Sequence, residues 1–272
     1  MGKLITQTTG EDNVKRLKII LLSFGIAFSL FFTKIFAQSD NLIDTYIVGG
    51  VYALIAMIGL LWAFSFRVRA ASFKYVLQGG IFVFSEVVFV LLFFFKQFDR
   101  IYEGLLLIVL LIFLWSITYA CFLMINVFNV SLFKNLPLIS VAQTASYILT
   151  LLMIYFLTFG ILASGFPLYV IFPLIFLTYV LLLYMEFIEL DIEGKRLRTI
   201  ILLVSLISTF LLIPFIFVGS NHEVISIVPM IGAFAGGGLL TLKEGDNVKW
   251  QIIGYNIALL VVILIAIYIS WF

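Results

Sequence analysis

Long runs of apolar residues constrain the fold of this chain more than any other feature of its sequence. A helix that crosses a membrane needs about 20 mostly apolar residues. The sequence holds nine such runs, at 19–37, 46–66, 75–95, 104–128, 139–163, 166–185, 199–219, 224–242 and 251–270. They predict an all-α, polytopic helical membrane protein with about nine transmembrane helices. Because the connections are short, we expect one transmembrane helical-bundle domain, 19–272, after a cytoplasmic N-terminal tail, 1–18.

Composition excludes the main alternative classes. Hydrophobic residues make up 64% of the chain and charged residues only 11%, whereas soluble domains carry roughly 25% charged residues. Intrinsic disorder requires the opposite balance of charge and hydrophobicity. A membrane β-barrel requires alternating apolar and polar positions, and the uninterrupted apolar run at 105–112 does not alternate. The basic residues form no cluster large enough to predict nucleic-acid binding.

The distribution of Lys and Arg predicts the orientation of the chain. With the N-terminus in the cytoplasm, 13 of the 16 Lys and Arg residues fall on the inner side, and only Lys34, Lys96 and Arg100 fall outside. Cytoplasmic loops carry the excess of basic residues in membrane proteins. We therefore expect an N-in orientation, in the cytoplasmic (plasma) membrane. The first run is too long for a secretory signal peptide, so we expect it to be retained as a helix.

The eighth run, 224–242, is the uncertain element of this topology. It contains Pro229, followed by a Gly-rich stretch at 232–238. Such a stretch is compatible with a full span, which we favour, or with a re-entrant helix that other protein segments shield from lipid. The re-entrant alternative gives eight spans and places the C-terminus on the inner side.

Glu86 is the most informative single residue for function. It lies inside an apolar run, 12 residues from Lys74 and 10 from Lys96, which places it roughly 15–18 Å from each charged edge of a helix. A charge at that depth costs at least a few kcal/mol, so the side chain should face the bundle or a cavity. We consider two roles for Glu86. The functional one is a carboxylate that couples transport to protons or binds a cation, and the alternative is a protonated carboxyl that is hydrogen-bonded to a neighbouring helix.

Two polar stripes form a second candidate site. Ser116, Tyr119, Asn126 and Asn129 recur on one face of the fourth run, and Gln143, Tyr147 and Thr150 recur on one face of the fifth. The spacings of three, four and seven residues keep each set on a single helix face. The two stripes could meet near the cytoplasmic side as a polar binding pocket. The alternative is a set of ordinary interhelical hydrogen bonds.

Small residues predict where helices approach closely. Gly49, Ala53, Ala56 and Gly59 follow a three/four spacing along the second run, and Gly232 and Gly236 form a small-xxx-small pair in the eighth. Such faces allow close helix packing. We expect internal packing, with a subunit interface as the alternative.

The sequence contains no recognisable catalytic motif, and we expect neither a cofactor nor a metal. The acidic residues Glu186, Glu189, Asp191 and Glu193 are followed by basic residues, which favours a solvated helix end over a cation site. His222 is the only histidine, so no two-histidine metal site can form. A lipid-modifying enzyme would need polar groups at one membrane interface, and only the two polar stripes offer them.

Two functional hypotheses follow from these residues. The first is a transporter or channel for a small solute or ion, with Glu86 as its coupling group; a Glu86 sealed among Phe side chains would contradict it. The second is a non-catalytic membrane scaffold or sensor subunit that acts through partner proteins. We expect the lipid bilayer as the main partner, with possible membrane protein partners or a homo-oligomer.

Overall fold

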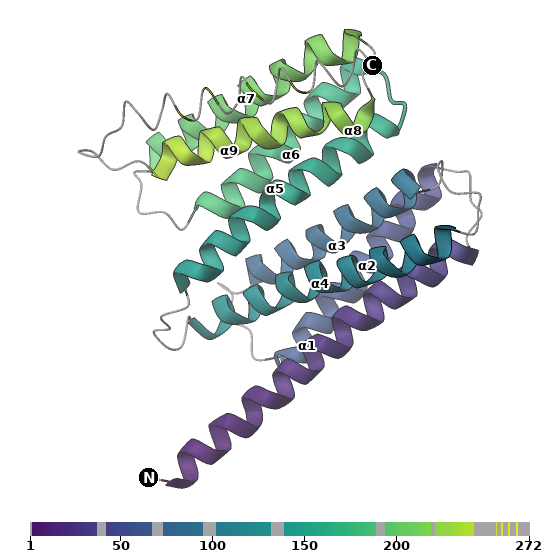
Figure 1. The fold of residues 1–272 in the computed structure, drawn as a ribbon. Helices are drawn as coiled ribbons and strands as arrows, with labels where there is room; N and C mark the ends of the chain where they lie inside the picture. The colour runs from purple at the N-terminus through teal and green to yellow at the C-terminus, as the bar shows by residue number, and fades with distance from the viewer. Residues whose placement is uncertain are drawn as a thin grey trace. The chain divides into compact units, whose positions relative to one another are not determined.

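The computed structural model describes residues 2–36, 42–66, 73–94, 102–131, 139–188, 194–218 and 221–241, together with 254, 257, 261 and 265. Within these ranges the chain is helical, and no strand occurs (Figure 1). The helices are α1 (Gly2–Phe36), α2 (Leu42–Ala63), α3 (Phe73–Phe94), α4 (Tyr102–Ser131), α5 (Ile139–Ala163), α6 (Leu168–Phe187), α7 (Gly194–Val218), α8 (His222–Ile225) and α9 (Ile227–Thr241).

Seven of the described helices are long and apolar enough to cross a membrane. Their candidate spans are Asn13–Lys34, Leu42–Ala63, Phe73–Phe93, Ile108–Val130, Val141–Ala163, Leu168–Phe187 and Leu197–Phe217. The prediction of an all-helical membrane protein is therefore confirmed for the described part of the chain. The predicted ninth run, 251–270, lies outside the described residues apart from four isolated positions, so the predicted count of nine stays a prediction.

The predicted eighth run is interrupted at its start. The short helix α8 ends at Ile225, Ser226 forms a turn, and α9 continues from Ile227. The 15 residues of α9 extend about 22 Å at 1.5 Å per residue, which is shorter than a hydrocarbon core of about 30 Å. The Gly-rich stretch itself stays helical, so the break lies before Pro229 rather than at the glycines. Both the full span and the re-entrant alternative remain open.

The chain divides into two compact units, Met1–Leu149 and Thr150–Phe272, with the division inside α5. In the first unit, α1 packs against α2 and α4, and α3 packs against the same two helices. The four helices therefore form a closed ring, in which each helix packs against the two beside it. In the second unit, α7 packs against both α6 and α9.

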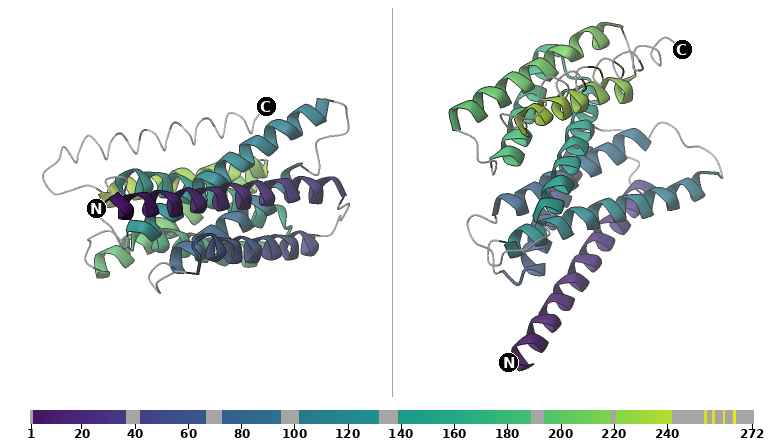
Figure 2. Two further views of the ribbon diagram at one scale, coloured as in Figure 1. Left: turned by 90° about the horizontal axis from the view of Figure 1, so that it is seen from below. Right: turned by 60° about the vertical axis from the view of Figure 1, so that its left-hand side comes forward.

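Helix α1 begins earlier than the predicted transmembrane run. It is continuous from Gly2 to Phe36, 35 residues, which corresponds to about 52 Å of helix. Its candidate span covers only Asn13–Lys34, and its N-terminal part extends beyond the other helices of the first unit (Figures 1 and 2). The predicted polar tail, 1–18, is thus largely a helical extension of the first span.

The small residues of α2 pack within the first unit. A Cβ added at Gly49 would lie 3.1 Å from both Phe84 Cδ2 and Val88 Cγ2 of α3. On the next turns, Ala56 is fully buried, and Gly59 faces Leu22 of α1. Ala53 contributes its carbonyl oxygen, which lies 3.4 Å from a Cβ added at Gly80. In this structure the small face therefore contacts α1 and α3.

The glycine pair of α9 packs within the second unit. A Cβ added at Gly232 would lie 2.5 Å from Ser208 Oγ, and one added at Gly236 would lie 2.5 Å from Val204 Cγ1. Both neighbours belong to α7, so the absence of side chains at the two glycines allows α7 and α9 to approach closely. This small-xxx-small pair joins helices of one chain.

Candidate functional site

Glu86 lies well inside the apolar part of α3. Its candidate span, Phe73–Phe93, places the residue about 20 Å from one end and about 10 Å from the other at 1.5 Å per residue. The side chain is 1% exposed. A carboxyl group in this position is removed from water. The free-energy cost of its burial therefore depends on the hydrogen bonds that it makes inside the protein.

The partner of Glu86 is Thr118 on α4. Thr118 Oγ1 lies 3.0 Å from Glu86 Oε1 and 2.9 Å from Glu86 Oε2. The same oxygen lies 2.8 Å from the carbonyl oxygen of Leu114, one turn earlier on α4. Thr118 is itself fully buried, so the carboxyl and the hydroxyl form one contact between α3 and α4.

Counting protons shows which form of Glu86 fits this contact. A threonine hydroxyl has one proton to donate and two lone pairs that accept, yet three oxygen atoms surround Thr118 Oγ1. If Glu86 is ionised, Thr118 can satisfy either the carboxylate or Leu114, but not both. If Glu86 carries its proton, Glu86 donates to Thr118 Oγ1 and Thr118 donates to Leu114. The neutral acid therefore gives both hydroxyl protons an acceptor without placing a charge in the apolar interior.

The Glu86–Thr118 pair is buried next to a phenylalanine layer. One turn before Glu86 lies Phe82, and one turn after Thr118 lies Phe122; both are 0% exposed. Val83, three residues before Glu86, and Val87, directly after it, are also 0% exposed. The hydrogen-bonded pair is thus closed to solvent, with the phenylalanine layer on one side of it.

A polar layer follows beyond Phe82 and Phe122. Helices α3 and α4 are antiparallel, with Gly79 facing Ile125 and with the rings of Tyr75 and Phe128 stacked at 4.8 Å. At this level, Gln78 Nε2 donates to Ser146 Oγ of α5 at 3.2 Å, and both residues are buried. From Glu86 toward the start of α3, three levels therefore follow one another. The first is the Glu86–Thr118 pair, the second is the layer of Phe82 and Phe122, and the third is the level of Gln78 and Ser146.

The predicted polar stripe of the fourth helix divides into different environments. Ser116 donates to Ile112 of its own helix at 2.7 Å and is exposed. Tyr119 is half-buried. Asn126 Oδ1 and Asn129 Oδ1 are buried, and neither has a hydrogen-bond partner in the part of the chain that the structure describes. The polar binding pocket proposed for the two stripes stays a prediction.

The predicted stripe of the fifth helix is also divided. Gln143 is exposed and Tyr147 is half-buried, whereas Thr150 is buried and donates to Glu186 Oε2 of α6 at 3.0 Å. Glu186 lies in the last turn of its candidate span and is half-buried. Glu186 therefore accepts a hydrogen bond from α5. Sequence analysis had instead placed it at a solvated helix end.

A second hydroxyl contact joins α5 and α6. Thr158 Oγ1 lies 2.7 Å from the hydroxyl of Tyr179 and 2.6 Å from the carbonyl oxygen of Ile154. Both side chains are buried. Thr158 has one proton, so donation from Tyr179 to Thr158 and from Thr158 to Ile154 satisfies all three groups.

The residues that sequence analysis missed are the partners: Thr118, Gln78, Ser146, Thr158 and Tyr179. Thr118 lies two residues from Ser116, but it is offset by about 200° around the helix, so the three/four spacing rule excluded it. A usable signal was the need of Glu86 for a donor or acceptor on an adjacent antiparallel helix. That requirement limits the search to polar residues at a similar depth, including Thr118.

No protein-family model matches this chain, and neither a curated protein nor a solved structure matches it. Among the described residues, no group of three or more His, Cys, Asp and Glu side chains could hold a metal ion.

Proposed function

We propose that this protein is a non-catalytic multi-pass membrane module, a scaffold or sensor subunit, in which Glu86 joins α3 to α4. The observation that supports the proposal is the burial of Glu86, which is 1% exposed and bonded to Thr118. A coupling carboxylate must exchange protons or ions with water during its cycle, and Phe82 and Phe122 separate this one from the polar layer. A protonated carboxyl with one hydroxyl partner functions as an interhelical hydrogen bond, which contributes about 0.6–1.7 kcal/mol in membrane proteins.

The proposal includes an orientation and a location. The excess of Lys and Arg on one side favours a cytoplasmic N-terminus, and we propose the plasma membrane as the location. Because the small faces of α2 and α9 pack inside their own units, a protein partner or a second copy would contact other faces of the chain.

Transport of a small ion is the second candidate, and one specific observation favours it. The Glu86–Thr118 pair and the Gln78–Ser146 pair lie along the same helix, α3, with one apolar layer between them. Movement of Phe82 and Phe122 would connect the carboxyl to the polar layer. In that case the present arrangement is a closed state, and Glu86 is the group that an ion or proton reaches after opening.

Flux measurements in proteoliposomes separate the two candidates. The intact protein, Glu86→Gln and Phe82→Ala are compared for proton and alkali-cation flux after each is shown to be folded. The module proposal predicts no flux above empty liposomes for the intact protein and for Glu86→Gln. If the intact protein shows flux and Glu86→Gln does not, the module proposal is wrong and the transport candidate takes its place.

A partner search provides the complementary evidence. The protein is extracted in its native lipid with a membrane-solubilising polymer, and co-purifying proteins are quantified against an unrelated polytopic protein prepared in parallel. The proposal predicts at least one partner at a reproducible ratio. A solitary chain in repeated native extracts would contradict a function that operates through partners.

A further inference from the structure

Basic residues and aromatic rings gather at one membrane boundary of the first unit. The candidate span of α1 begins at Asn13, that of α2 ends at Ala63, and that of α3 begins at Phe73. Since α1 and α3 each pack against α2, these three ends lie at the same boundary. The basic side chains described here are Lys15, Arg16, Lys18 and Lys74.

Lys18 and Trp62 form the best-defined contact at this boundary. Lys18 Nζ lies 4.8 Å from the centroid of the Trp62 ring and 3.5 Å from the carbonyl oxygen of Trp62. Trp62 is 45% exposed, so the ammonium group rests on a tryptophan that is not covered by the rest of the chain. A cation over tryptophan is stabilised by about 0.5–1 kcal/mol at exposed sites.

The end of α2 places the Trp62 carbonyl at this point. Ser65 N–H donates to Trp62 O at 3.0 Å, and Phe66 N–H donates to Leu61 O at 2.8 Å. Ser65 and Phe66 both have φ of 56°, a left-handed conformation that ends the helix. The negative end of the α2 dipole therefore points toward Lys18, which favours a cation there. Phe66 is 69% exposed and extends the aromatic surface.

We propose that the Lys18–Trp62 contact is a docking site for the phosphate of an anionic phospholipid. Lys18 lies five residues inside the start of the α1 candidate span, and Trp62 is the residue before the end of the α2 candidate span. A lysine side chain can extend its ammonium group from such a position toward the interface, where tryptophan is enriched. Anionic headgroups attract each nearby Lys or Arg by about 1 kcal/mol. Lys15, three residues before Lys18, lies on the same face of α1 and adds positive charge there, whereas Arg16, two residues before Lys18, does not face the same way.

The printed contacts decide which cation of this boundary leads. Lys18 is the basic residue whose ammonium group contacts Trp62. We therefore assign the leading role to Lys18 and Trp62, and a smaller role to Lys15.

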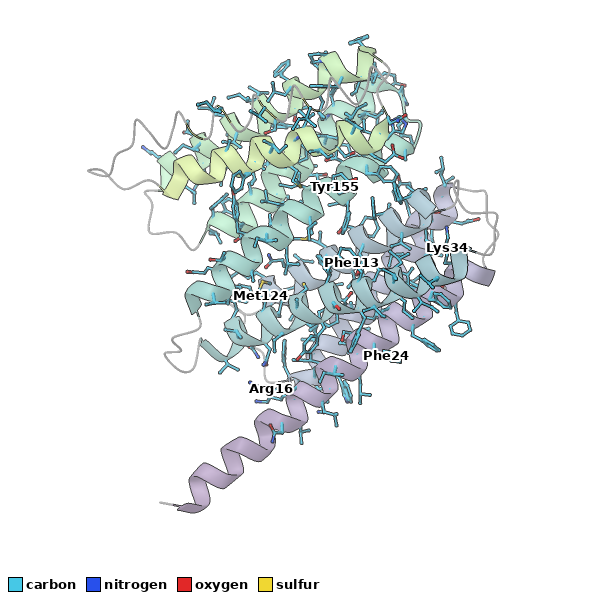
Figure 3. All side chains as sticks on the ribbon, viewed as in Figure 1. Arg16, Phe24, Lys34, Phe113, Met124 and Tyr155 are labelled. Carbon is cyan, nitrogen blue, oxygen red and sulfur yellow. The ribbon has the colours of Figure 1, made fainter. Side chains whose placement is uncertain are left out.

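The test compares melting temperatures in nanodiscs of a zwitterionic phospholipid with and without an anionic phospholipid. Three chains are measured: the intact protein, Lys18→Gln, and Lys34→Gln, which removes one positive charge near the C-terminal end of α1 (Figure 3 labels Arg16 partway along α1 and Lys34 toward its C-terminal end). Comparing the lipid-dependent shift within each chain cancels any direct effect of a substitution on folding. Native mass spectrometry counts the retained anionic lipids, and Trp62→Leu provides an independent variant.

The proposal predicts that anionic lipid raises the melting temperature of the intact protein and of Lys34→Gln. It predicts a reduced shift and about fivefold weaker lipid retention in Lys18→Gln, with a similar loss in Trp62→Leu. Added salt should weaken the effect, and soluble inorganic phosphate at the same concentration should not reproduce it. Equal shifts in the intact protein and Lys18→Gln, or no shift in either, would overturn the proposal.

Discussion

Thr118 Oγ1 lies within 3.0 Å of both carboxyl oxygens of Glu86, although the two residues are 32 positions apart and belong to different helices. Both side chains are buried among apolar residues of the first unit. The contact joins α3 and α4 where both side chains are closed to solvent. It also means that the cost of burying the carboxyl depends on the Thr118 hydroxyl group.

The first prediction concerns the removal of that hydroxyl. Thr118→Val keeps the shape of the side chain but leaves the Glu86 carboxyl without its partner, so we expect the free energy of unfolding to fall by about 1–3 kcal/mol. Denaturant-induced unfolding in mixed micelles measures the change. Thr178→Val is the matched control, because Thr178 donates only to Leu174 of its own helix and is not buried. Equal losses in the two variants would contradict a special role for the Glu86–Thr118 contact.

Glu86→Gln should be milder than Thr118→Val. The glutamine amide can donate to Thr118 Oγ1, while Thr118 donates to Leu114, so the hydrogen bond between α3 and α4 is kept. We expect a loss below about 1 kcal/mol, measured by the same unfolding assay. A larger loss for Glu86→Gln than for Thr118→Val would show that the charged form of Glu86 is the one that stabilises the fold.

An asymmetric pair of substitutions tests the proton arrangement between α5 and α6. Tyr179→Phe leaves Thr158 bonded to Ile154, so we expect a loss of about 0.5–1.5 kcal/mol. Thr158→Val leaves the buried Tyr179 hydroxyl without an acceptor, and we expect about 1–3 kcal/mol. Both values come from unfolding curves, with the double variant completing a thermodynamic cycle. The reverse order would mean that Thr158 donates to Tyr179.

Two glycines of the first unit test the packing of its helices. A Cβ added at Gly79 would lie 2.7 Å from both Ile125 Cδ1 and Leu60 Cδ1, whereas one added at Gly50 meets nothing within 4 Å. Both positions are inside helices, so alanine should gain the same 0.5–1 kcal/mol or so of helix stability at each. We expect Gly50→Ala to be neutral or stabilising, and Gly79→Ala to be destabilised by about 1–3 kcal/mol through overpacking. Thermal melts of both variants in one detergent provide the comparison, and indistinguishable melts would contradict it.

The helical membrane class was predictable from sequence, because an apolar run of about 20 residues has few other structures available to it. The burial of Glu86 was also predictable, since lipid exposure of a carboxyl is costly. Its partner was not, because the register of α3 against α4 depends on how Gly79 fits against Ile125 and how Tyr75 stacks on Phe128. Such packing details involve residues far apart in the chain.

The polar stripes show a second limit of sequence periodicity. The spacing predicted one shared face for the stripe of the fourth run, but it gave no indication that Ser116 would bond to its own helix. A serine or threonine in a membrane helix can satisfy its hydroxyl locally, at the carbonyl one turn before. Whether a polar residue bonds within its helix or across to another depends on the neighbour at that depth, which one sequence does not specify.

The most direct test of the account uses Cys121, the only cysteine of the chain. It lies one turn after Thr118 on α4 and is 1% exposed, so its thiol reports whether water reaches the surroundings of Glu86. The intact protein is embedded in liposomes and treated with a water-soluble maleimide over a range of pH, with a denatured sample as the labelling standard. A sealed structural Glu86 predicts no labelling above background at any pH at which the protein stays folded. Rapid labelling of the folded protein that slows in Glu86→Gln would contradict that claim and indicate a water-accessible path to the carboxyl.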